Sequence, residues 1–96
     1  MKRKRLYRVE ASSARIKREL RSIPLFDRER VIKVIEALKE NPRPHGIVQL
    51  EPNVYRLRVG EYRVIYKVFD GEQLVIIGRV ARRSEKTYQG IRGLFG

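Results

Sequence analysis

Three arginines of this chain are spaced so that one β-hairpin would bring their side chains together. Arg56 and Arg58 alternate within the stretch 54–59, and Arg63 follows the two-residue turn that Gly60-Glu61 predicts. In that register Arg58 lies opposite Arg63, and all three side chains share one face of the hairpin. Opposed arginines repel each other, which suggests that an anion binds there. Phosphate is the obvious candidate, because the guanidinium fork matches its oxygens.

A second group of basic residues follows the last predicted strand. The group consists of Arg79, Arg82, Arg83 and Lys86, and Tyr88 comes five residues after Arg83. Cations beside an aromatic ring are typical of a nucleic-acid site, because the ring can stack on a base while the cations hold phosphates. The strand arginines alone are equally consistent with a solvated face that pairs with neighbouring glutamates. The second group favours the nucleic-acid interpretation.

The composition excludes several kinds of site and favours a polyanionic partner. The 96 residues include 23 Lys and Arg against 11 Asp and Glu, a net charge of +12, which points to nucleic acid, the ribosome or an acidic protein. Four of these cations form a basic start at residues 2–5, which is expected to be a solvated end. The absence of cysteine excludes thiol catalysis and cysteine-based zinc sites.

Metal, cofactor and membrane functions are not expected either. The single histidine, His45, lies in a proline-bounded loop, where a structural role is expected. The glutamates of the helices show no paired arrangement, so neither a metal-dependent nuclease nor a cofactor is predicted. No apolar run reaches the roughly 18–20 residues of a membrane span, and a cytoplasmic protein without membrane contact is therefore expected.

The first half of the chain is predicted to form a strand and two helices. Residues 6–10 alternate like a strand, and Ser12 or Ser13 would cap a helix that Pro24 ends. A second helix is expected to begin with Asp27 as its cap and to end at a turn rich in proline. The apolar positions that indicate these helices are Ile16, Leu20, Ile23, Val31, Val34, Ile35 and Leu38. Their short connection predicts an antiparallel helical hairpin.

The second half is predicted to form a three-stranded antiparallel meander over residues 54–59, 61–69 and 73–81. The apolar face of its first hairpin should lie under the helices; it carries Tyr55, Leu57, Val59, Tyr62, Val64 and Tyr66. The order is β-α-α-β-β-β with a short helical tail. This is an α+β fold, in which an N-terminal strand and a helical hairpin pack on a small antiparallel sheet in one domain, 1–96.

The turn predicted at Asp70-Gly71 sets the register of the last strand. A two-residue turn there would place Gly78 opposite Arg63, where the glycine would leave room beside the arginines. It would also point the Arg79 side chain at the helix-covered face, where a structural ion pair is expected. The tail ends in the apolar segment 91–95, which should cover the apolar end of the arginine-bearing face or form a docking surface for a partner.

Three stretches of the chain resemble the RelE/ParE superfamily of type II toxins. They are "ENPRPHG" after the helices, "VYRLRVGEYRVIYKV" across the first hairpin and "LVIIGRVARRSEKTY" from the last strand onward. The resemblance covers nearly the whole chain and implies a single RelE-like toxin domain with a cognate antitoxin that wraps and neutralises it. RelE-like members are ribosome-dependent ribonucleases that cut mRNA in the A site. ParE-like members share the fold and inhibit DNA gyrase instead.

The resemblance implies a catalytic role for five residues. The family's two basic positions on one strand match Arg56 and Arg58, and the arginine that opens the next strand matches Arg63. The C-terminal arginine and tyrosine of the family match Arg83 and Tyr88. The neighbouring cations are expected to bind RNA; they are Arg82 and Lys86. The best-known RelE enzymes have lysines at the two strand positions and one more residue between the C-terminal arginine and tyrosine.

The expected reaction is RNA cleavage by attack of a 2′-OH on the neighbouring phosphorus. The arginines would stabilise the negative charge of the phosphoryl oxygens, Tyr88 would take the 2′ proton or stack on a base, and Arg83 would support the leaving 5′ oxygen. An alternative from a different class is a ParE-like inhibitor of a topoisomerase that cuts nothing. A third is an inactive member whose basic face binds only an acidic antitoxin segment. The presence of both Arg83 and Tyr88 favours the nuclease.

Overall fold

The computed structural model describes residues 6–95, so the basic start at residues 2–5 lies outside the described part of the chain. The elements are β1 (Arg8–Ala11), α1 (Arg15–Arg21), α2 (Leu25–Ala37), β2 (Val48–Glu51), β3 (Val54–Val59), β4 (Tyr62–Phe69) and β5 (Leu74–Arg82), followed by two 3₁₀ helices, Glu85–Tyr88 and Ile91–Phe95. This order confirms the expected α+β fold and adds one strand, β2, to the prediction.

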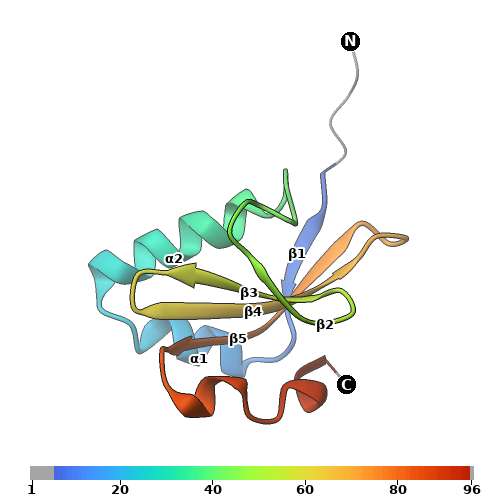
Figure 1. Ribbon diagram of the computed structural model, residues 1–96. Helices are drawn as coiled ribbons and strands as arrows, with labels where there is room; N and C mark the ends of the chain where they lie inside the picture. Colours follow the sequence, from blue (N-terminus) through green and yellow to red (C-terminus); the bar gives the residue numbers. More distant parts are fainter. Residues whose placement is uncertain (1–5, 96) are drawn as a thin grey trace.

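The strands form one five-stranded mixed sheet in the order β1-β5-β4-β3-β2. Strands β3, β4 and β5 form the predicted antiparallel meander. Strand β1 joins β5 in parallel at one edge, and β2 pairs with β3 at the other. The two helices cover one face of the sheet, and the C-terminal 3₁₀ helices lie against the other (Figure 1).

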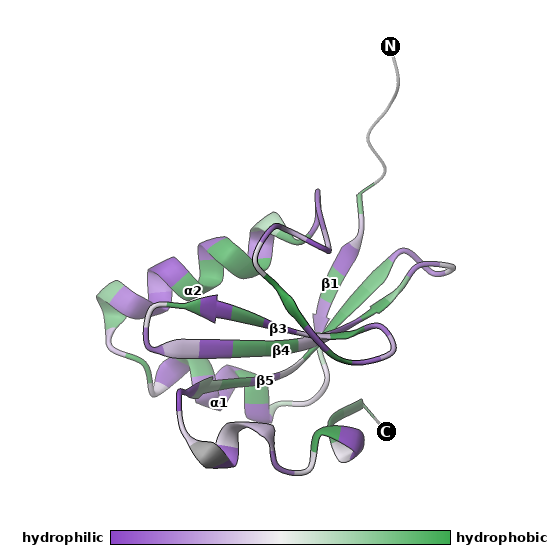
Figure 2. Cartoon of the chain, viewed as in Figure 1, coloured by the Kyte–Doolittle hydropathy of each residue, from purple (hydrophilic) through white to green (hydrophobic). Residues whose placement is uncertain are grey.

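Two apolar cores lie on opposite faces of this sheet. The larger core packs the helices on the sheet and contains all six side chains predicted on the first hairpin. The smaller core lies under the C-terminal tail and contains Val54, Ile65 and Leu94. The segment 91–95 therefore covers the arginine-bearing face of the sheet. This was the first of the two roles expected for it from the sequence. Figure 2 shows the apolar and polar positions alternating along α2 and the central strands, as helices and strands between two environments require.

The first β-hairpin has the predicted register. Arg58 lies opposite Arg63, on either side of the Gly60-Glu61 turn. Gly60 has a φ of +57°, in the left-handed region that glycine enters without steric cost. The side chains on each strand alternate between the faces, so the three arginines lie on the face opposite the helices.

The turn of the second β-hairpin was predicted wrongly. The loop contains four residues instead of the two expected from its Asp-Gly pair. It closes through a hydrogen bond of 3.1 Å from the N–H of Gln73 to the carbonyl of Asp70, and Gln73 has a φ of +50°. The longer loop moves β5 along β4 by two residues, and a bulge further along β5 adds one more, so that Arg63 faces Ala81 and not Gly78.

A β-bulge at Gly78 changes the second half of β5. The pairing shifts by one residue next to Ile65, so that Ile65 faces Arg79 and Gly78 faces no residue of β4. Because the bulge reverses the alternation, Arg79 projects toward the C-terminal tail, and the prediction that it faces the helices is wrong. The space at Gly78 holds the Phe95 ring: a Cβ there would lie 2.6 Å from a ring carbon.

Both helices begin at residues other than those predicted. Helix α1 begins at Arg15 with Ala14 at its N-cap, and the Ser13 hydroxyl accepts a hydrogen bond of 3.3 Å from the N–H of Arg15. Helix α2 begins at Leu25, because the carbonyl of Pro24 accepts the first helical hydrogen bond from the N–H of Arg28 at 2.9 Å. Asp27 therefore lies in the first turn, where its negative charge interacts favourably with the helix dipole.

Strand β2 has no counterpart in the sequence prediction. Its four side chains are exposed or half-buried, so that no strong apolar alternation marks it. Only its pairing with β3, across a turn in which Asn53 has a φ of +62°, defines it as a strand.

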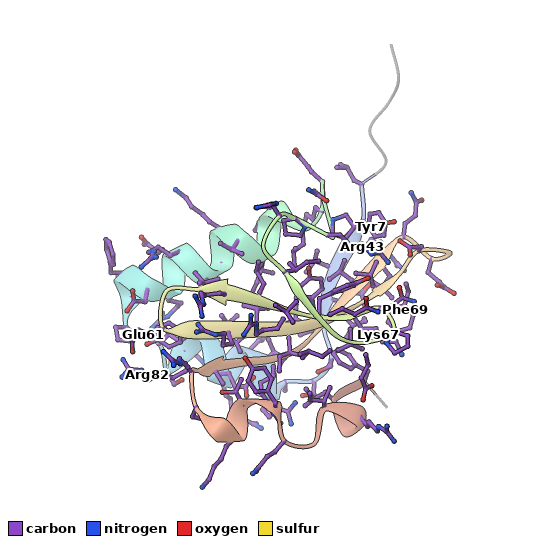
Figure 3. All side chains as sticks on the ribbon, viewed as in Figure 1. Tyr7, Arg43, Glu61, Lys67, Phe69 and Arg82 are labelled. Carbon is purple, nitrogen blue, oxygen red and sulfur yellow. The ribbon has the colours of Figure 1, made fainter. Side chains whose placement is uncertain are left out.

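Arg43 and Tyr7 lie close together at the end of the sheet away from the Gly60-Glu61 turn (Figure 3), and both belong to a cluster of five hydrogen-bonded residues. Arg43 donates two hydrogen bonds to the carboxylate of Asp70, at 2.8 and 3.0 Å. It also donates to the Tyr55 hydroxyl at 2.8 Å and to Asn53 Oδ1 at 3.0 Å, while the Tyr7 hydroxyl donates to Asp70 at 2.7 Å. We call these five residues the Arg43 clamp. The bonds from Arg43 and Tyr7 lower the pKa of the Asp70 carboxyl to about 2.

Candidate functional site

The face of the sheet opposite the helices carries a pocket of about 460 Å³. Side chains from β3, from β4 and from the segment after β5 line it; they are Arg56, Arg58, Arg63, Arg83, Ser84 and Tyr88. We call this group the arginine pocket. It brings together all five residues that the sequence analysis selected as catalytic, although their role in a reaction stays a prediction. Ser84 is the lining residue that the sequence analysis did not select.

The three strand arginines differ in how firmly the protein holds them. The Arg63 side chain is 3% exposed, and its Nη1 donates to the carbonyls of Gly60 and Tyr62, both at 2.9 Å. Arg56 is half-buried, and Arg58, directly opposite Arg63, is exposed. The turn therefore holds one guanidinium in place, while Arg58 presents an accessible one to a ligand.

Tyr88 belongs both to the smaller core and to the pocket. Its ring packs against the cluster around Ile65, and its hydroxyl accepts a hydrogen bond of 3.2 Å from Nη1 of Arg56. The two residues are 32 positions apart in the sequence. Packing of the ring and the charge-assisted hydrogen bond together direct the phenol oxygen toward the cations of the pocket.

Backbone and hydroxyl hydrogen bonds hold the segment after β5 at the pocket. The N–H of Arg83 donates to the carbonyl of Glu61 at 2.7 Å, which extends the pairing of β5 to the first turn. Thr87 is 2% exposed, and its hydroxyl donates to the carbonyl of Arg82 at 3.0 Å. The same hydroxyl accepts a bond of 3.0 Å from the N–H of Ser84. These bonds tie the tail into a tight turn beside the sheet.

The positive charge of the arginine pocket is not neutralised by the carboxylates that the structure describes. Within residues 6–95, apart from the side chain of Glu85, which is not described, no carboxylate forms an ion pair with a pocket arginine, and Glu51 pairs with Arg92 at 3.2 Å instead. In the same part of the chain, the Nε atoms of Arg56 and Arg63 are buried without a hydrogen-bond partner. Buried cationic donors without partners are costly, so the arrangement favours binding of an anion.

The two residues expected to bind RNA lie outside the pocket. The guanidinium carbon of Arg82 lies 5.7 Å from the centroid of the Tyr62 ring, which belongs to the helix-covered core. Figure 3 shows Arg82 close to Glu61, at the end of the sheet where the first turn lies. The Lys86 side chain is exposed on the first 3₁₀ helix. RNA contacts by Arg82 and Lys86 remain predictions.

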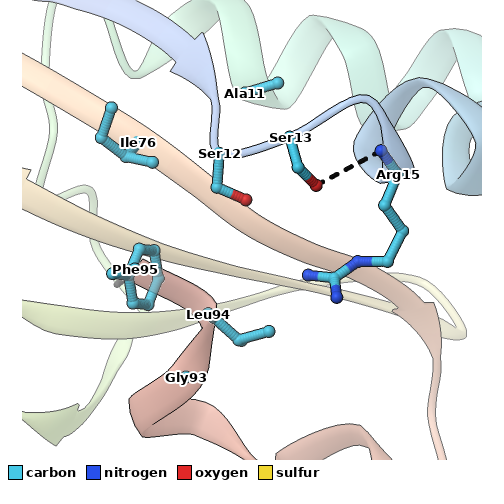
Figure 4. Close-up of a pocket in the computed structure, with 8 residues that line it drawn as sticks. All are labelled: Ala11, Ser12, Ser13, Arg15, Ile76, Gly93, Leu94 and Phe95. Carbon is cyan, nitrogen blue, oxygen red and sulfur yellow. Dashed lines mark hydrogen bonds between the residues drawn. The ribbon is translucent and has the colours of Figure 1, made fainter.

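A second cavity, of about 490 Å³, lies between the β1–α1 connection and the end of the tail (Figure 4). Ser12 and Arg15 line one side of it, and Leu94 and Phe95 line the other. Arg15 is the charged residue among its lining, and its Nη2 already donates to the carbonyl of Gly78 at 2.9 Å. This cavity therefore lacks the grouped cations that distinguish the arginine pocket.

The described residues contain no group of three or more His, Cys, Asp and Glu that could hold a metal ion. His45 is exposed in the loop after α2 and does not line the arginine pocket. The groups in the pocket that could accept a proton are the hydroxyls of Tyr88 and Ser84. In the same part of the chain, no helix is long and apolar enough to cross a membrane.

Sequence reasoning missed two residues that build the site and misplaced a third. Ser84 and Thr87 form a reciprocal cap around the first 3₁₀ helix. Their Ser-x-x-Thr spacing is a signal that could have identified the pair. Arg79 donates to the carbonyls of Thr87 and Gln89, but no local pattern marks the bulge that points it there.

Residues 8–87 match the family model of the ParE toxin of the type II toxin-antitoxin system parDE. A protein named as toxin RelE1 from Methanocaldococcus jannaschii is 31% identical over 74 residues, which cover 72% of this chain and 82% of that protein. The chain belongs to the RelE/ParE superfamily of type II toxins. The expectation from the three sequence stretches is thereby confirmed.

Solved structures of RelE toxins share the fold of this toxin. A chain of the archaeal RelE–RelB complex from Pyrococcus horikoshii OT3 has a TM-score of 0.76 at 28% identity, and the match covers 83% of this chain and 98% of that chain. A chain of the intact E. coli RelBE toxin–antitoxin complex has a TM-score of 0.69 at 26% identity and covers 82% and 99%. The RelBE2 complex of Mycobacterium tuberculosis, at 22% identity and a TM-score of 0.71 over 88% and 100%, supports the fold alone.

Proposed function

We propose that this toxin is a metal-independent, ribosome-dependent endoribonuclease that cleaves mRNA in the A site. The observation that carries the proposal is the arginine pocket, in which four arginines line the same cavity as a phenol that accepts a hydrogen bond of 3.2 Å from Arg56. Cleavage of a phosphodiester needs fixed positive charge for the phosphoryl oxygens and a proton acceptor beside it. This pocket combines both.

The scissile phosphate binds between the opposed guanidinium groups of Arg58 and Arg63. Arg63 is buried and held by two carbonyls, so it does not have to reorganise when the substrate arrives. Arg58 is exposed and lies across the hairpin from it, so that the two can contact oxygens of one phosphate. Binding of the anion also relieves the repulsion between the two side chains.

Cleavage begins with attack of the 2′-oxygen on the adjacent phosphorus. The O2′–P bond forms as the P–O5′ bond breaks, which leaves a 2′,3′-cyclic phosphate and a 5′-hydroxyl. Tyr88, in its phenolate form, takes the 2′ proton and becomes a phenol, and the strand arginines stabilise the charge that builds on the phosphoryl oxygens. The departing 5′ oxygen, supported by Arg83, takes up a proton from water.

This toxin has arginines at positions 56 and 58, where the best-known RelE enzymes have lysines, and this difference changes which residues can act as bases. Arginine stays protonated in proteins, so Arg56 and Arg58 act as fixed charges and not as bases. The hydrogen bond from Arg56 to the Tyr88 hydroxyl supports a base function for Tyr88. The resemblance to RelE enzymes, and not the pocket itself, implies that the ribosome aligns the mRNA.

The same proposal includes a cognate antitoxin as the neutralising partner. Relatives of this chain have been solved as RelE–RelB complexes. The net charge of +12 and the arginines without described carboxylate partners favour a partner segment rich in acidic residues. Such a segment would occupy the position of the RNA phosphate and so block cleavage.

A second candidate function is ParE-like inhibition of DNA gyrase without cleavage of RNA. The match of residues 8–87 to the ParE toxin model favours it. A supercoiling assay with purified gyrase separates the two candidates, because a nuclease leaves gyrase active. A toxin that leaves both mRNA and gyrase intact would be the inactive member that the sequence analysis also considered.

The test of the proposed function is mRNA integrity in a translating extract. We expect the wild-type protein to produce cuts that map to the ribosomal A site, and Arg83→Ala to lose them. Tyr88→Phe tests the base separately, because it keeps the ring and removes the hydroxyl. Arg18→Ala is the matched control, since Arg18 is an exposed arginine of α1 on the other side of the sheet. Intact mRNA with the wild-type protein would contradict the proposal.

A further inference from the structure

We infer that Arg79 is a positioning residue that holds Tyr88 in the arginine pocket. The consequence of this for catalysis rests on the proposed nuclease function, whereas the placement of Tyr88 does not. Arg79 does not line the pocket, and it contacts the backbone on both sides of Tyr88. It therefore acts on a reaction through Tyr88 and not through the substrate.

The contacts of Arg79 converge on the turn that carries Tyr88. Its Nη1 donates to the carbonyls of Thr87 and Gln89, the latter at 2.7 Å, and the carbonyl of Lys86 lies at 3.5 Å. Carbonyls at the C-terminal end of a helical turn have few partners within the turn and carry partial negative charge. One guanidinium nitrogen thus satisfies the carbonyls of the residue before Tyr88 and of the residue after it.

The turn around Tyr88 needs such an external support. The 3₁₀ helix Glu85–Tyr88 has four residues, and helices of this length are not stable through their own hydrogen bonds. The Ser84–Thr87 cap holds its beginning, and Arg79 holds its end. Packing of the Tyr88 ring against the smaller core restrains the ring, but the carbonyl contacts set the backbone from which the ring projects.

The β-bulge at Gly78 is what places Arg79 on this face. Val75 and Ile77 belong to the helix-covered core, so regular alternation would put Arg79 there as well, but Val80 takes that position instead. The extra residue at Gly78 reverses the alternation and sends Arg79 to the opposite face, across from Ile65.

Helix α1 holds this bulge through a pair of side chains one turn apart. Nη2 of Arg15 donates to the carbonyl of Gly78 at 2.9 Å, and Oε1 of Glu19 accepts from the N–H of Val80 at 2.9 Å. Arg15 and Glu19 also approach each other to 3.8 Å. The pairing of β1 with β5 ends at Ile77, and the backbone groups of Gly78 and Val80 beyond that point find partners on α1. A connected set of polar contacts runs from α1 through the bulge to Arg79.

The first test measures the position of Tyr88 independently of any nuclease activity. The protein is labelled with 3-fluorotyrosine, which reports on its five tyrosines by ¹⁹F NMR, and Tyr88→Phe assigns the Tyr88 resonance. We expect Arg79→Met to shift and broaden that resonance while the other four stay in place, and Arg79→Lys to restore part of the change. Arg18→Met is the matched control. An unchanged Tyr88 resonance in folded Arg79→Met would overturn the inference.

The second test is a double-mutant cycle in single-turnover cleavage on ribosomes. We expect Arg79→Met to slow the cleavage step by about 10- to 100-fold, as a misplacement on the order of 1 Å does, with the apparent affinity for ribosomes unchanged. In the Tyr88→Phe background the same substitution should have no further effect. An equal loss in both backgrounds would show that Arg79 acts elsewhere. If the wild-type protein does not cleave mRNA, the proposed function fails, and the NMR measurement alone decides the position of Tyr88.

Discussion

Two clusters that contain arginine, at opposite ends of one sheet, differ in charge balance. In the Arg43 clamp, a single guanidinium makes two hydrogen bonds to the carboxylate of Asp70 and two more to neighbouring side-chain oxygens. In the arginine pocket, four guanidinium groups lie together without an ion pair to any carboxylate that the structure describes. Arg43 is also exposed, like Arg58, so burial does not explain the difference.

The comparison shows two different roles for arginine side chains in one protein. An arginine that finds its anion inside the protein contributes to folding, because its charge and donors are satisfied in the native state. An exposed arginine without an anion, such as Arg58, contributes little to folding and is available to a ligand that supplies the negative charge. We therefore expect substitutions in the clamp to change stability and substitutions in the pocket to change activity.

The largest effect is expected from an exposed pocket arginine. Arg58→Met should lower the rate of mRNA cleavage by about 100- to 1,000-fold, the usual loss when one group that stabilises a transition state is removed. Its Tm should stay the same or rise, because the substitution removes repulsion with Arg63 across the hairpin. Cleavage assays and thermal unfolding of the same preparation check both parts. A clear drop in Tm would remove the distinction between pocket and clamp.

For the Arg43 clamp we expect a loss of stability without a loss of cleavage activity. Arg43→Met should lower the Tm by about 5–10 °C, because it leaves the hydroxyl of buried Tyr55 and the amide of Asn53 without their partner. Cleavage at a temperature where the variant is folded should equal that of the wild-type protein. Thermal unfolding followed by circular dichroism measures the first effect. A variant that melts normally but fails to cleave would reverse the comparison.

Acid should weaken the clamp selectively. The pKa of the Asp70 carboxyl lies at about 2, below its ordinary value of 3.8, so the folded state binds this proton less readily than the unfolded state. The stabilisation is complete above pH of about 4 and is lost as the pH falls toward 2. Urea unfolding across this window should show the loss in the wild-type protein and a flatter profile in Asp70→Asn. Equal slopes in the two proteins would argue against the clamp as its source.

The smallest effect is stabilisation of the pocket by an added anion. Inorganic phosphate at a concentration equal to its Kd should add about 0.4 kcal/mol to the free energy of unfolding, a rise in Tm of about 2 °C. The rise should persist in Arg43→Met and disappear in Arg58→Met, with chloride at the same ionic strength as the reference. A rise that both variants retain would place the phosphate outside the arginine pocket.

Local patterns predicted much of the strand half of the site. Residues 54–63 form a hairpin with a two-residue turn, and each residue's face follows from its position relative to that turn. The pairing of Arg58 with Arg63 was therefore accessible from the sequence, and the structure confirms it. The start of α2 was missed because a proline carbonyl can begin a helix without a capping side chain. Edge strand β2 was missed because its side chains are not buried.

The second hairpin shows where local patterns fail. Its Asp-Gly pair predicted a tight turn, but the carboxylate of Asp70 is engaged by Arg43 and Tyr7, and the loop has four residues. The bulge at Gly78 is held by Arg15 and Glu19, which lie about sixty residues earlier in the chain; the separations are 63 from Arg15 to Gly78 and 61 from Glu19 to Val80. No short stretch of the sequence therefore contains both the bulge and the side chains that hold it.

By itself, the sequence determined which arginines share the face of the first hairpin and which superfamily the chain belongs to. Alternation and tight turns depend on adjacent residues, and the family's motifs lie within continuous stretches. Only the tertiary structure decided that Arg82 leaves the pocket, that Arg79 turns toward the tail and that the Tyr88 hydroxyl meets Arg56. Those outcomes depend on a one-residue shift in strand pairing, and a shift of one residue exchanges the two faces of a strand.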